Sequence, residues 1–360
     1  MTDDKFSMTN FQSFQPLKPF PRRKSTKKGE MRPPGAHLTF LGRVCRPSIL
    51  TLILIGMSDR FMKKTFLAFG LALGLAAAAC AQSPGVPVVR QGHGSVPEPD
   101  LVAEAARLRE AGQLLNLDDV KHQFGKSSCR LDLPPANNRP LSGSEIWSRA
   151  RDAHLRVGYL YYCNVCKKLH LQLAGGYALT ADGAAATCLH VLRAKDLKEG
   201  HLVAVTEAGV VLPVTEILAC DKSADVCILR VRPAAPLRPL PLNANVSPGD
   251  DVWCYSDPAS RPGFFSHGIV NRFYQEWDGA EAGTQHPRRM NVSTDWGPGS
   301  SGAAVVDRFG NAVGQVCAIS AHGSNLPSEK PSGTNHTAME TVIVFHEAVC
   351  GADVAALVRH

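Results

Sequence analysis

The chain has 360 residues with 39 Lys or Arg and 32 Asp or Glu, and its formal net charge of +7 is of the sign expected for binding to nucleic acid or an anionic membrane. That charge is local, because residues 1–64 hold 13 Lys or Arg and 4 Asp or Glu, which leaves 26 and 28 in residues 65–360, a net charge of −2. We therefore expect no nucleic-acid partner for the folded part of the chain.

The first 81 residues predict a leader and a signal peptide. Residues 1–61 are rich in Pro, Lys and Arg, and we expect a non-native or disordered leader; the alternative is a genuine basic tail. Residues 62–81 begin at Met62 with a basic end, continue with an apolar stretch and close on alanines, the order of a secretory signal. Cleavage after Ala81 predicts a periplasmic or secreted protein, whereas cleavage before Cys80 would leave a cysteine that can carry a lipid anchor.

Residues 82–144 predict a Pro- and Gly-rich linker followed by a helical pre-domain. Apolar residues at helical spacing predict a helix over residues 99–115. Ser142 and Glu145 can form the capping box of a second helix, which runs toward Leu155. We expect this helix to brace the first of the two barrels described next; a regulatory or autoinhibitory role is the alternative.

Residues 145–360 have the spacing of an all-β domain, with short β-branched segments separated by turns. A Pro-rich link at residues 233–241 divides these segments into two sets. They predict two β-barrels, about residues 156–240 and 241–350, each large enough to bury its own core. The expected strands are residues 171–180, 184–188, 202–206, 210–218 and 226–231, then 251–255, 264–273, 288–294, 302–306, 312–320 and 341–345. A helix is expected at the C-terminal end, over residues 351–360.

Three short motifs carry the residue types of nucleophilic catalysis. Ser301 lies between Gly299 and Gly302 in a turn that enters an apolar strand, so the backbone can expose one hydroxyl beside free N–H groups. Taken alone, the motif is more typical of an ordinary Gly- and Ser-rich turn between two strands. His190 comes at the end of an expected strand and Asp225 at the start of another. A base and an orienting carboxylate are what a serine needs to become a nucleophile.

From about residue 156 to its end, the chain resembles a trypsin-like serine protease of the bacterial Deg type, which has a chymotrypsin-like two-barrel fold. Residues 187–192, 223–231 and 296–307 are similar, in this order, to the family motifs T-N-A-H-V-V, D-L-A-V-L-K-V and P-G-N-S-G-G-P-L-V. Residues 267–270 are similar to the S-G-I-V strand of the family. No PDZ domain is expected, although many Deg proteases carry one.

The resemblance implies an exported serine endopeptidase that acts on protein or peptide substrates without a cofactor or a bound metal. Asp225 would orient His190, and His190 would take the proton of Ser301 as this serine attacks the peptide carbonyl. The backbone N–H groups of Gly299 and Ser301 would hold the oxyanion. Asp221 competes for the orienting role, but it precedes the strand at whose start Asp225 stands.

The segment before the serine offers one indication of specificity. Asp295 lies six residues before Ser301, the spacing at which trypsin-like enzymes that cut after Arg or Lys carry a buried acid in the primary pocket. The alternative is that Thr294 and Asp295 correspond to the Thr-Asp pair that ends a strand in Deg proteases, whose pocket accepts small aliphatic side chains. Ala303 replaces a family glycine, and we expect it to narrow the backbone conformations beside the nucleophile.

Nine cysteines follow the signal peptide, and in an exported protein they are expected to form disulfides with one thiol left free. Cys163, Cys166, His170 and Cys188 could instead bind zinc. We favour a Cys163–Cys166 disulfide, because neighbouring cysteines in an oxidising compartment more often pair with each other and because no second CxxC motif is present to complete a zinc site. Cys188 is not expected to be the nucleophile, because it shares the strand of the histidine.

Two other function classes are consistent with parts of this sequence. A catalytically silent protease-fold protein that binds peptides or scaffolds a complex would need the same barrels but no working triad. An α/β-hydrolase esterase would need a G-x-S-x-G turn between a strand and a helix, with the histidine after the serine. Position 303 is alanine, the segment after Ser301 is strand-like and His190 precedes it, so the esterase is disfavoured.

Overall fold

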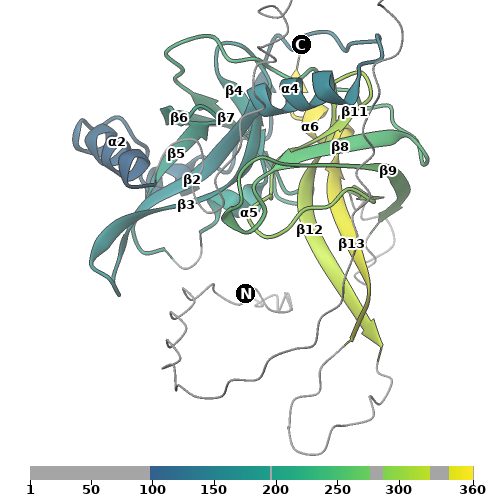
Figure 1. Cartoon of the computed structure of the whole chain (residues 1–360). Helices are drawn as coiled ribbons and strands as arrows, with labels where there is room; N and C mark the ends of the chain where they lie inside the picture. The colour runs from purple at the N-terminus through teal and green to yellow at the C-terminus, as the bar shows by residue number, and fades with distance from the viewer. Residues whose placement is uncertain (1–97, 195–196, 276–286, 325–339, 360) are drawn as a thin grey trace, which may run out of the picture. The chain divides into compact units, whose positions relative to one another are not determined.

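The computed structural model describes residues 98–194, 197–275, 287–324 and 340–359. Two closed six-stranded β-barrels dominate this part of the chain (Figure 1). The predicted all-β, two-barrel fold is confirmed.

The first barrel has the strand order β2-β3-β4-β7-β6-β5. Its strands are β2 (His154–Cys163), β3 (Lys168–Ala178), β4 (Ala184–Thr187), β5 (His201–Thr206), β6 (Val211–Asp221) and β7 (Val226–Val231). Alternate side chains point into the barrel, and Val157, Tyr159, Leu202 and Leu229 are almost fully buried there. This core fixes the end of β4 and the start of β7. The candidate base His190 follows β4, and the candidate acid Asp225 directly precedes β7.

The second barrel has the order β10-β13-β12-β11-β8-β9. Its strands are β8 (Asp251–Ser256), β9 (Phe264–Gln275), β10 (Arg288–Val292), β11 (Ala304–Asp307), β12 (Ala312–Ser324) and β13 (Glu340–Cys350). Val252, Met290 and Val305 lie in its core. The turn before β11 holds the candidate serine, so the two barrels bring the three motifs toward one another.

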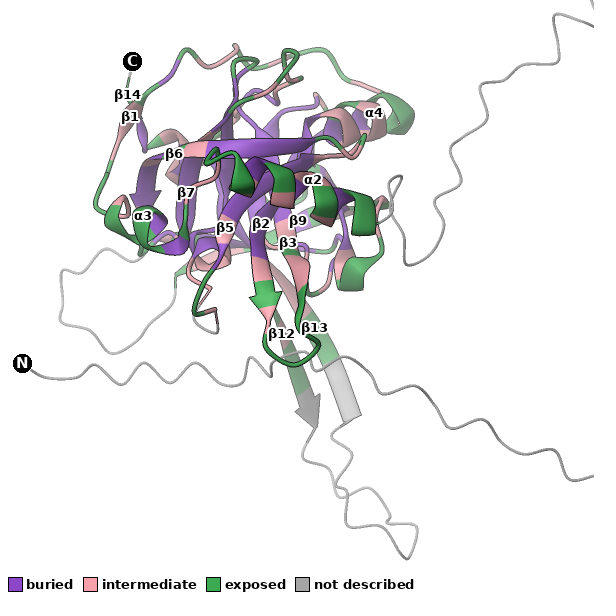
Figure 2. Ribbon diagram, turned by 90° about the vertical axis from the view of Figure 1, so that its left-hand side faces the viewer, coloured by how far each residue is buried: buried purple, intermediate pink, exposed green. Residues whose placement is uncertain are grey.

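Short helices surround the barrels, and in Figure 2 the outer faces of α2 and α3 are largely exposed while the strands beneath are buried. The helices are α2 (Glu98–Glu110), α3 (Leu117–His122), α4 (Gly143–Ala153), α5 (Leu189–Leu192), α6 (Gly351–Ala355) and the 3₁₀ turn η1 (Pro258–Ser260). None of the helices in the described ranges is both long enough and apolar enough to cross a membrane.

Helix α4 begins as predicted, but it packs on both barrels and not on the first alone. Ser142 is its N-cap, and the capping box with Glu145 is complete, because each side chain accepts a hydrogen bond from the backbone of the other residue. The expected packing on the first barrel was incomplete. Ile146 and Ala150 are buried in a cluster that spans both barrels, and α4 contacts β8 and β11 of the second one.

Several expected boundaries were wrong. The second helix ends at Ala153 and β2 follows without a turn, so the sequence analysis missed this strand. The expected C-terminal helix is only α6, after which β14 (Val358–Arg359) pairs in parallel with β1 (Cys129–Arg130). This pairing ties the C-terminal end of the domain to the segment that precedes α4.

Candidate active site

His190 lies on a one-turn helix that leaves the end of β4. Thr187 closes β4, and its hydroxyl donates to the backbone oxygen of Gly175 on β3 at 2.7 Å. Leu189 and Leu192 turn inward and are buried, which fixes the helix on the barrel. The His190 side chain is left 36% exposed, so its ring is both anchored and accessible.

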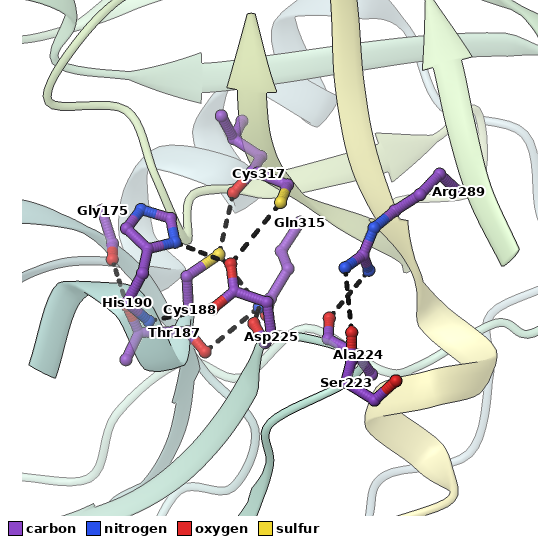
Figure 3. Close-up of polar contacts among 11 residues, drawn as sticks. Gly175, Thr187, Cys188, His190, Ser223, Ala224, Asp225, Arg289, Gln315 and Cys317 are labelled. Carbon is purple, nitrogen blue, oxygen red and sulfur yellow. Dashed lines mark hydrogen bonds and ion pairs between the residues drawn. The ribbon is translucent and has the colours of Figure 1, made fainter. Parts of the chain in front are cut away.

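Asp225 meets His190 from the start of β7, as Figure 3 shows. Asp221 prepares its position by accepting hydrogen bonds from the N–H groups of Ser223 and Ala224, which turns the chain before Asp225. The Asp225 Oδ2 atom lies 2.6 Å from His190 Nδ1, and Oδ1 accepts the backbone N–H of His190 at 2.8 Å. Asp221 was the alternative orienting residue, but its carboxylate stabilises this turn, and Asp225 is the residue that contacts His190.

The environment keeps the Asp225 carboxyl ionised. Burial alone would raise its pKa, but the hydrogen bonds and charge interaction with His190 outweigh burial, and the pKa is lowered. Asp225 itself has a φ of 58°, an uncommon conformation for a residue other than glycine. A strained residue held by several hydrogen bonds at a cleft is a common feature of functional sites.

Two side chains of β12 brace this pair from the second barrel. The Gln315 amide donates to the backbone oxygens of Thr187 at 3.1 Å and Asp225 at 3.4 Å, so it joins the two strand ends (Figure 3). The Cys317 thiol lies 3.5 Å from Asp225 Oδ2. The alignment of base and acid therefore depends on contacts between the barrels.

Arg289 of β10 makes a second contact between the barrels. Its side chain is buried and donates to the backbone oxygens of Ala224 at 2.8 Å and Ser223 at 3.2 Å (Figure 3). Arg289 and Gln315 were missed by the sequence analysis, because a single polar residue in a strand has no local pattern that reveals a partner 65 or more positions away.

The turn that carries Ser301 packs against the turn that carries His190. Gly302 has a φ of 88°, and a Cβ there would lie 2.4 Å from both the Gly175 oxygen and the Thr187 hydroxyl, and 3.0 Å from the backbone nitrogen of Cys188. Only glycine permits this close approach. Ser301 thus stands beside the residues that lead into α5. Gly302 takes the left-handed conformation, whereas Ala303 does not have a positive φ, so the structure accommodates an alanine at position 303 without that strain.

The backbone around Ser301 presents two free donors. In the described ranges, neither the Gly299 N–H nor the Ser301 N–H donates a hydrogen bond, whereas the N–H groups of Ser300 and Gly302 donate to the backbone oxygens of Gly297 and Val316. Within the same ranges the Ser301 hydroxyl forms no hydrogen bond either, including to His190. The structure thus places His190 and Asp225 in direct contact. It brings Ser301 near them only through its neighbour Gly302, which packs against the residues that lead into α5.

Comparison with known families agrees with this architecture. The family model described as trypsin-like peptidase domain matches residues 175–314. The chain contains a trypsin-like peptidase domain. The match includes His190, Asp225 and Ser301 and ends within β12. No curated protein matches the chain.

Asp295 precedes the turn that carries Ser301, but its carboxylate is not buried. The side chain is 74% exposed, and its Oδ1 atom lies 4.0 Å from His346 Nε2. Its neighbours Thr294 and Trp296 are the buried members of this segment. The trypsin-like arrangement requires a buried carboxylate, and this position does not provide one.

A buried polar cluster supports the loop before the serine. Asp257 follows β8, accepts the N–H of Gly263 at 2.9 Å, and places Oδ2 3.5 Å from His154 Nε2 and 3.7 Å from Arg156 Nε. Burial alone would raise the pKa of Asp257, but His154 and Arg156 outweigh it and the pKa is lowered. Two residues on, the Ala259 N–H donates to the oxygen of Pro298, so the cluster positions the backbone next to Gly299.

All nine cysteines in the described ranges are free thiols, and two of them, Cys220 and Cys227, face each other across β6 and β7 with their sulfurs 3.1 Å apart. The four-ligand zinc site considered from the sequence is wrong in one ligand. Cys188 lies beside His190 and Asp225, whereas Cys163, Cys166 and His170 form a different group. Burial raises the pKa of the Cys188 thiol far above its usual value, which disfavours the thiolate that a nucleophile requires.

Proposed function

We propose that this protein is a serine endopeptidase that hydrolyses peptide bonds through His190, Asp225 and Ser301. The observation that carries the proposal is the double contact of Asp225 with His190, at the backbone nitrogen and at Nδ1. This arrangement fixes the ring with Nδ1 toward the carboxylate, so Nε2 is the nitrogen left to accept a proton.

The mechanism follows from these positions. Nε2 of His190 takes the proton of the Ser301 hydroxyl while Oγ attacks the peptide carbonyl, and Asp225 stabilises the imidazolium that forms. The carbonyl oxygen becomes an oxyanion, which the N–H groups of Gly299 and Ser301 stabilise by about 3 kcal/mol each. As the C–N bond breaks, His190 returns the proton to the leaving amine. Water then hydrolyses the acyl-enzyme by the same proton route.

One observation favours the second candidate function, a catalytically silent protein that binds peptides or scaffolds a complex. The Ser301 hydroxyl has no hydrogen bond to His190. Catalytic hydrogen bonds are often long in the absence of substrate, however. The N–H groups of Gly299 and Ser301 also donate to no other group within the described residues, so the endopeptidase is the better-supported function. Protein or peptide chains are the expected partners in both cases.

The test of the endopeptidase is a comparison of wild type with Ser301→Ala on an unfolded protein substrate. We expect fragments from wild type and none from the variant, with thermal unfolding nearly unchanged because only one hydroxyl is lost. Ser223→Ala, which removes an exposed hydroxyl, is the matched control. Equal proteolysis by wild type and Ser301→Ala would disprove the role of the serine.

We also infer that the protein is exported, with Met62 as its first residue and a signal peptide over residues 62–81. These positions lie outside the described residues, so the inference rests on the order of basic, apolar and small residues in the sequence. Mass spectrometry of the protein from its native host should find an N-terminus at Gln82, or a lipid on Cys80. Peptides from residues 1–61 in the mature protein would contradict the assigned start.

A further inference from the structure

The hairpin between β2 and β3 carries a group of metal-binding side chains that has no part in the proposed mechanism. Its turn comprises residues 164–167, and Cys163 and Lys168 face each other at the last pair of the ladder. The Lys167 N–H donates to the Cys163 oxygen at 2.9 Å, and Lys167 has a φ of 59°. This tight turn brings Cys166 back toward the strand that carries Cys163.

The strand register brings a histidine to the same face. His170 on β3 pairs directly with Tyr161 on β2, so the two side chains share one face of the sheet. Cys163, two residues after Tyr161, also lies on that face because side chains alternate along a strand. His170 Nε2 lies 2.9 Å from the Cys166 sulfur, and one ligand atom from each of the three residues lies within 4.8 Å of the others. The ligands of a tetrahedral zinc ion are about 3.5–3.8 Å apart, judged from the bond lengths, so small side-chain rotations complete the geometry.

One neighbouring carboxylate faces the histidine of this group. Glu98, the first residue of α2, places Oε1 3.9 Å from His170 Nδ1, so one ring nitrogen faces a carboxylate while the other faces the sulfurs. Metal-binding histidines commonly donate their other ring N–H to a carboxylate, and a small rotation of the exposed Glu98 side chain would close the 3.9 Å gap to a hydrogen bond. The exposed Cys166 leaves the group open to solvent.

We propose that Cys163, Cys166 and His170 bind one zinc ion at the tip of the β2–β3 hairpin, with a water molecule in the fourth position. Two thiolates and an imidazole suit zinc and not magnesium or calcium, which prefer oxygen ligands. Each thiol releases its proton on binding, and two thiolates balance the charge of the ion. Through Glu98 the bound ion would also fix the start of α2 on the hairpin. The site replaces the disulfide that the sequence alone favours for this pair.

The experiment uses the purified whole chain, reduced and freed of metal. Equilibrium dialysis against zinc should give one ion per chain, and cobalt in its place should give thiolate-to-cobalt charge-transfer absorption with the visible bands of a tetrahedral site. Cys166→Ser and His170→Ala should lose the ion. Glu98→Gln should weaken zinc affinity by about 10–100-fold, the usual cost of losing such a second partner.

Two control variants carry the same residue types outside the group. Cys129→Ser removes a partly buried thiol, and His267→Ala removes an exposed histidine that also pairs with a carboxylate, that of Asp251. Both should bind zinc as wild type does. No zinc binding by the reduced wild-type chain would overturn the proposal, and so would full retention of zinc by Cys166→Ser. A Cys163–Cys166 disulfide in the protein isolated from its host would also overturn it.

Discussion

Replacing Asp225 by Asn tests how the carboxylate acts on His190. The backbone N–H of His190 donates to Oδ1 at 2.8 Å and therefore requires an acceptor at that atom. An asparagine would keep its oxygen there, and its NH₂ group would face Nδ1, which lies 2.6 Å from Oδ2 in the wild type. The amide would then donate to Nδ1, which leaves the ring proton on Nε2, the nitrogen that must accept the serine proton.

The expected magnitude follows from this wrong tautomer. The equivalent loss in a serine triad is about four orders of magnitude in kcat, or about 5 kcal/mol of transition-state stabilisation. The assay is kcat/KM for a peptide series at neutral pH, with folding checked by circular dichroism. Asp221→Asn is the matched control, since it keeps the Oδ1 acceptor that builds the turn and should retain wild-type activity. A folded Asp225→Asn enzyme within tenfold of wild type would refute the reasoning.

Three further predictions concern the packing, the pH dependence and the specificity of the site. Gly302→Ala should lower the free energy of unfolding by about 2–5 kcal/mol. The new Cβ would lie 2.4 Å from both Gly175 O and Thr187 Oγ1, and a φ of 88° is strained for alanine. A loss below about 0.5 kcal/mol in denaturant unfolding would contradict this prediction. The pKa of the Asp225 carboxyl is lower in the folded chain than its value of about 3.9 in the unfolded chain, so the ionised carboxylate stabilises the fold. This stabilisation is fully present above the unfolded pKa and is lost as the pH falls through the folded pKa. The difference in free energy of unfolding between wild type and Asp225→Asn, measured in urea titrations, should accordingly shrink at acid pH. A difference that stays constant with pH would contradict this prediction. Asp295→Ala removes a side chain that is 74% exposed, so the relative cleavage after Arg, Val and Phe should not change, and loss of cleavage after Arg alone would place Asp295 in the pocket.

Much of the fold could be predicted because its signals are local. The short β-branched segments and the Ser142 capping box depend on neighbouring residues only, and the structure contains both. β2 was missed since His154 begins a strand directly after a helix, with no Gly or Pro to mark the change. The C-terminal helix was expected to be too long because β14 depends on pairing with β1, more than 200 positions away.

The candidate site divides in the same way. His190 and Asp225 stand at strand ends that short motifs identify, and the structure brings them into contact. Gln315 and Arg289, which brace them, depend on how the second barrel docks against the first. The proposed zinc ligands divide too. The CxxC spacing is visible in the sequence, whereas the exclusion of Cys188 and the proximity of Glu98 to His170 require the fold.

Covalent labelling of the wild-type protein with a fluorophosphonate tests the central claim most directly. The probe forms a bond from an activated serine Oγ to phosphorus and releases fluoride, so it reports nucleophilicity without knowledge of the substrate. Peptide mapping should find the label on Ser301, with none on Ser300, whose hydroxyl is buried against Ser256 at 3.1 Å. His190→Ala should suppress labelling. A folded wild-type protein that takes no label, or takes it at a residue other than Ser301, would contradict the account.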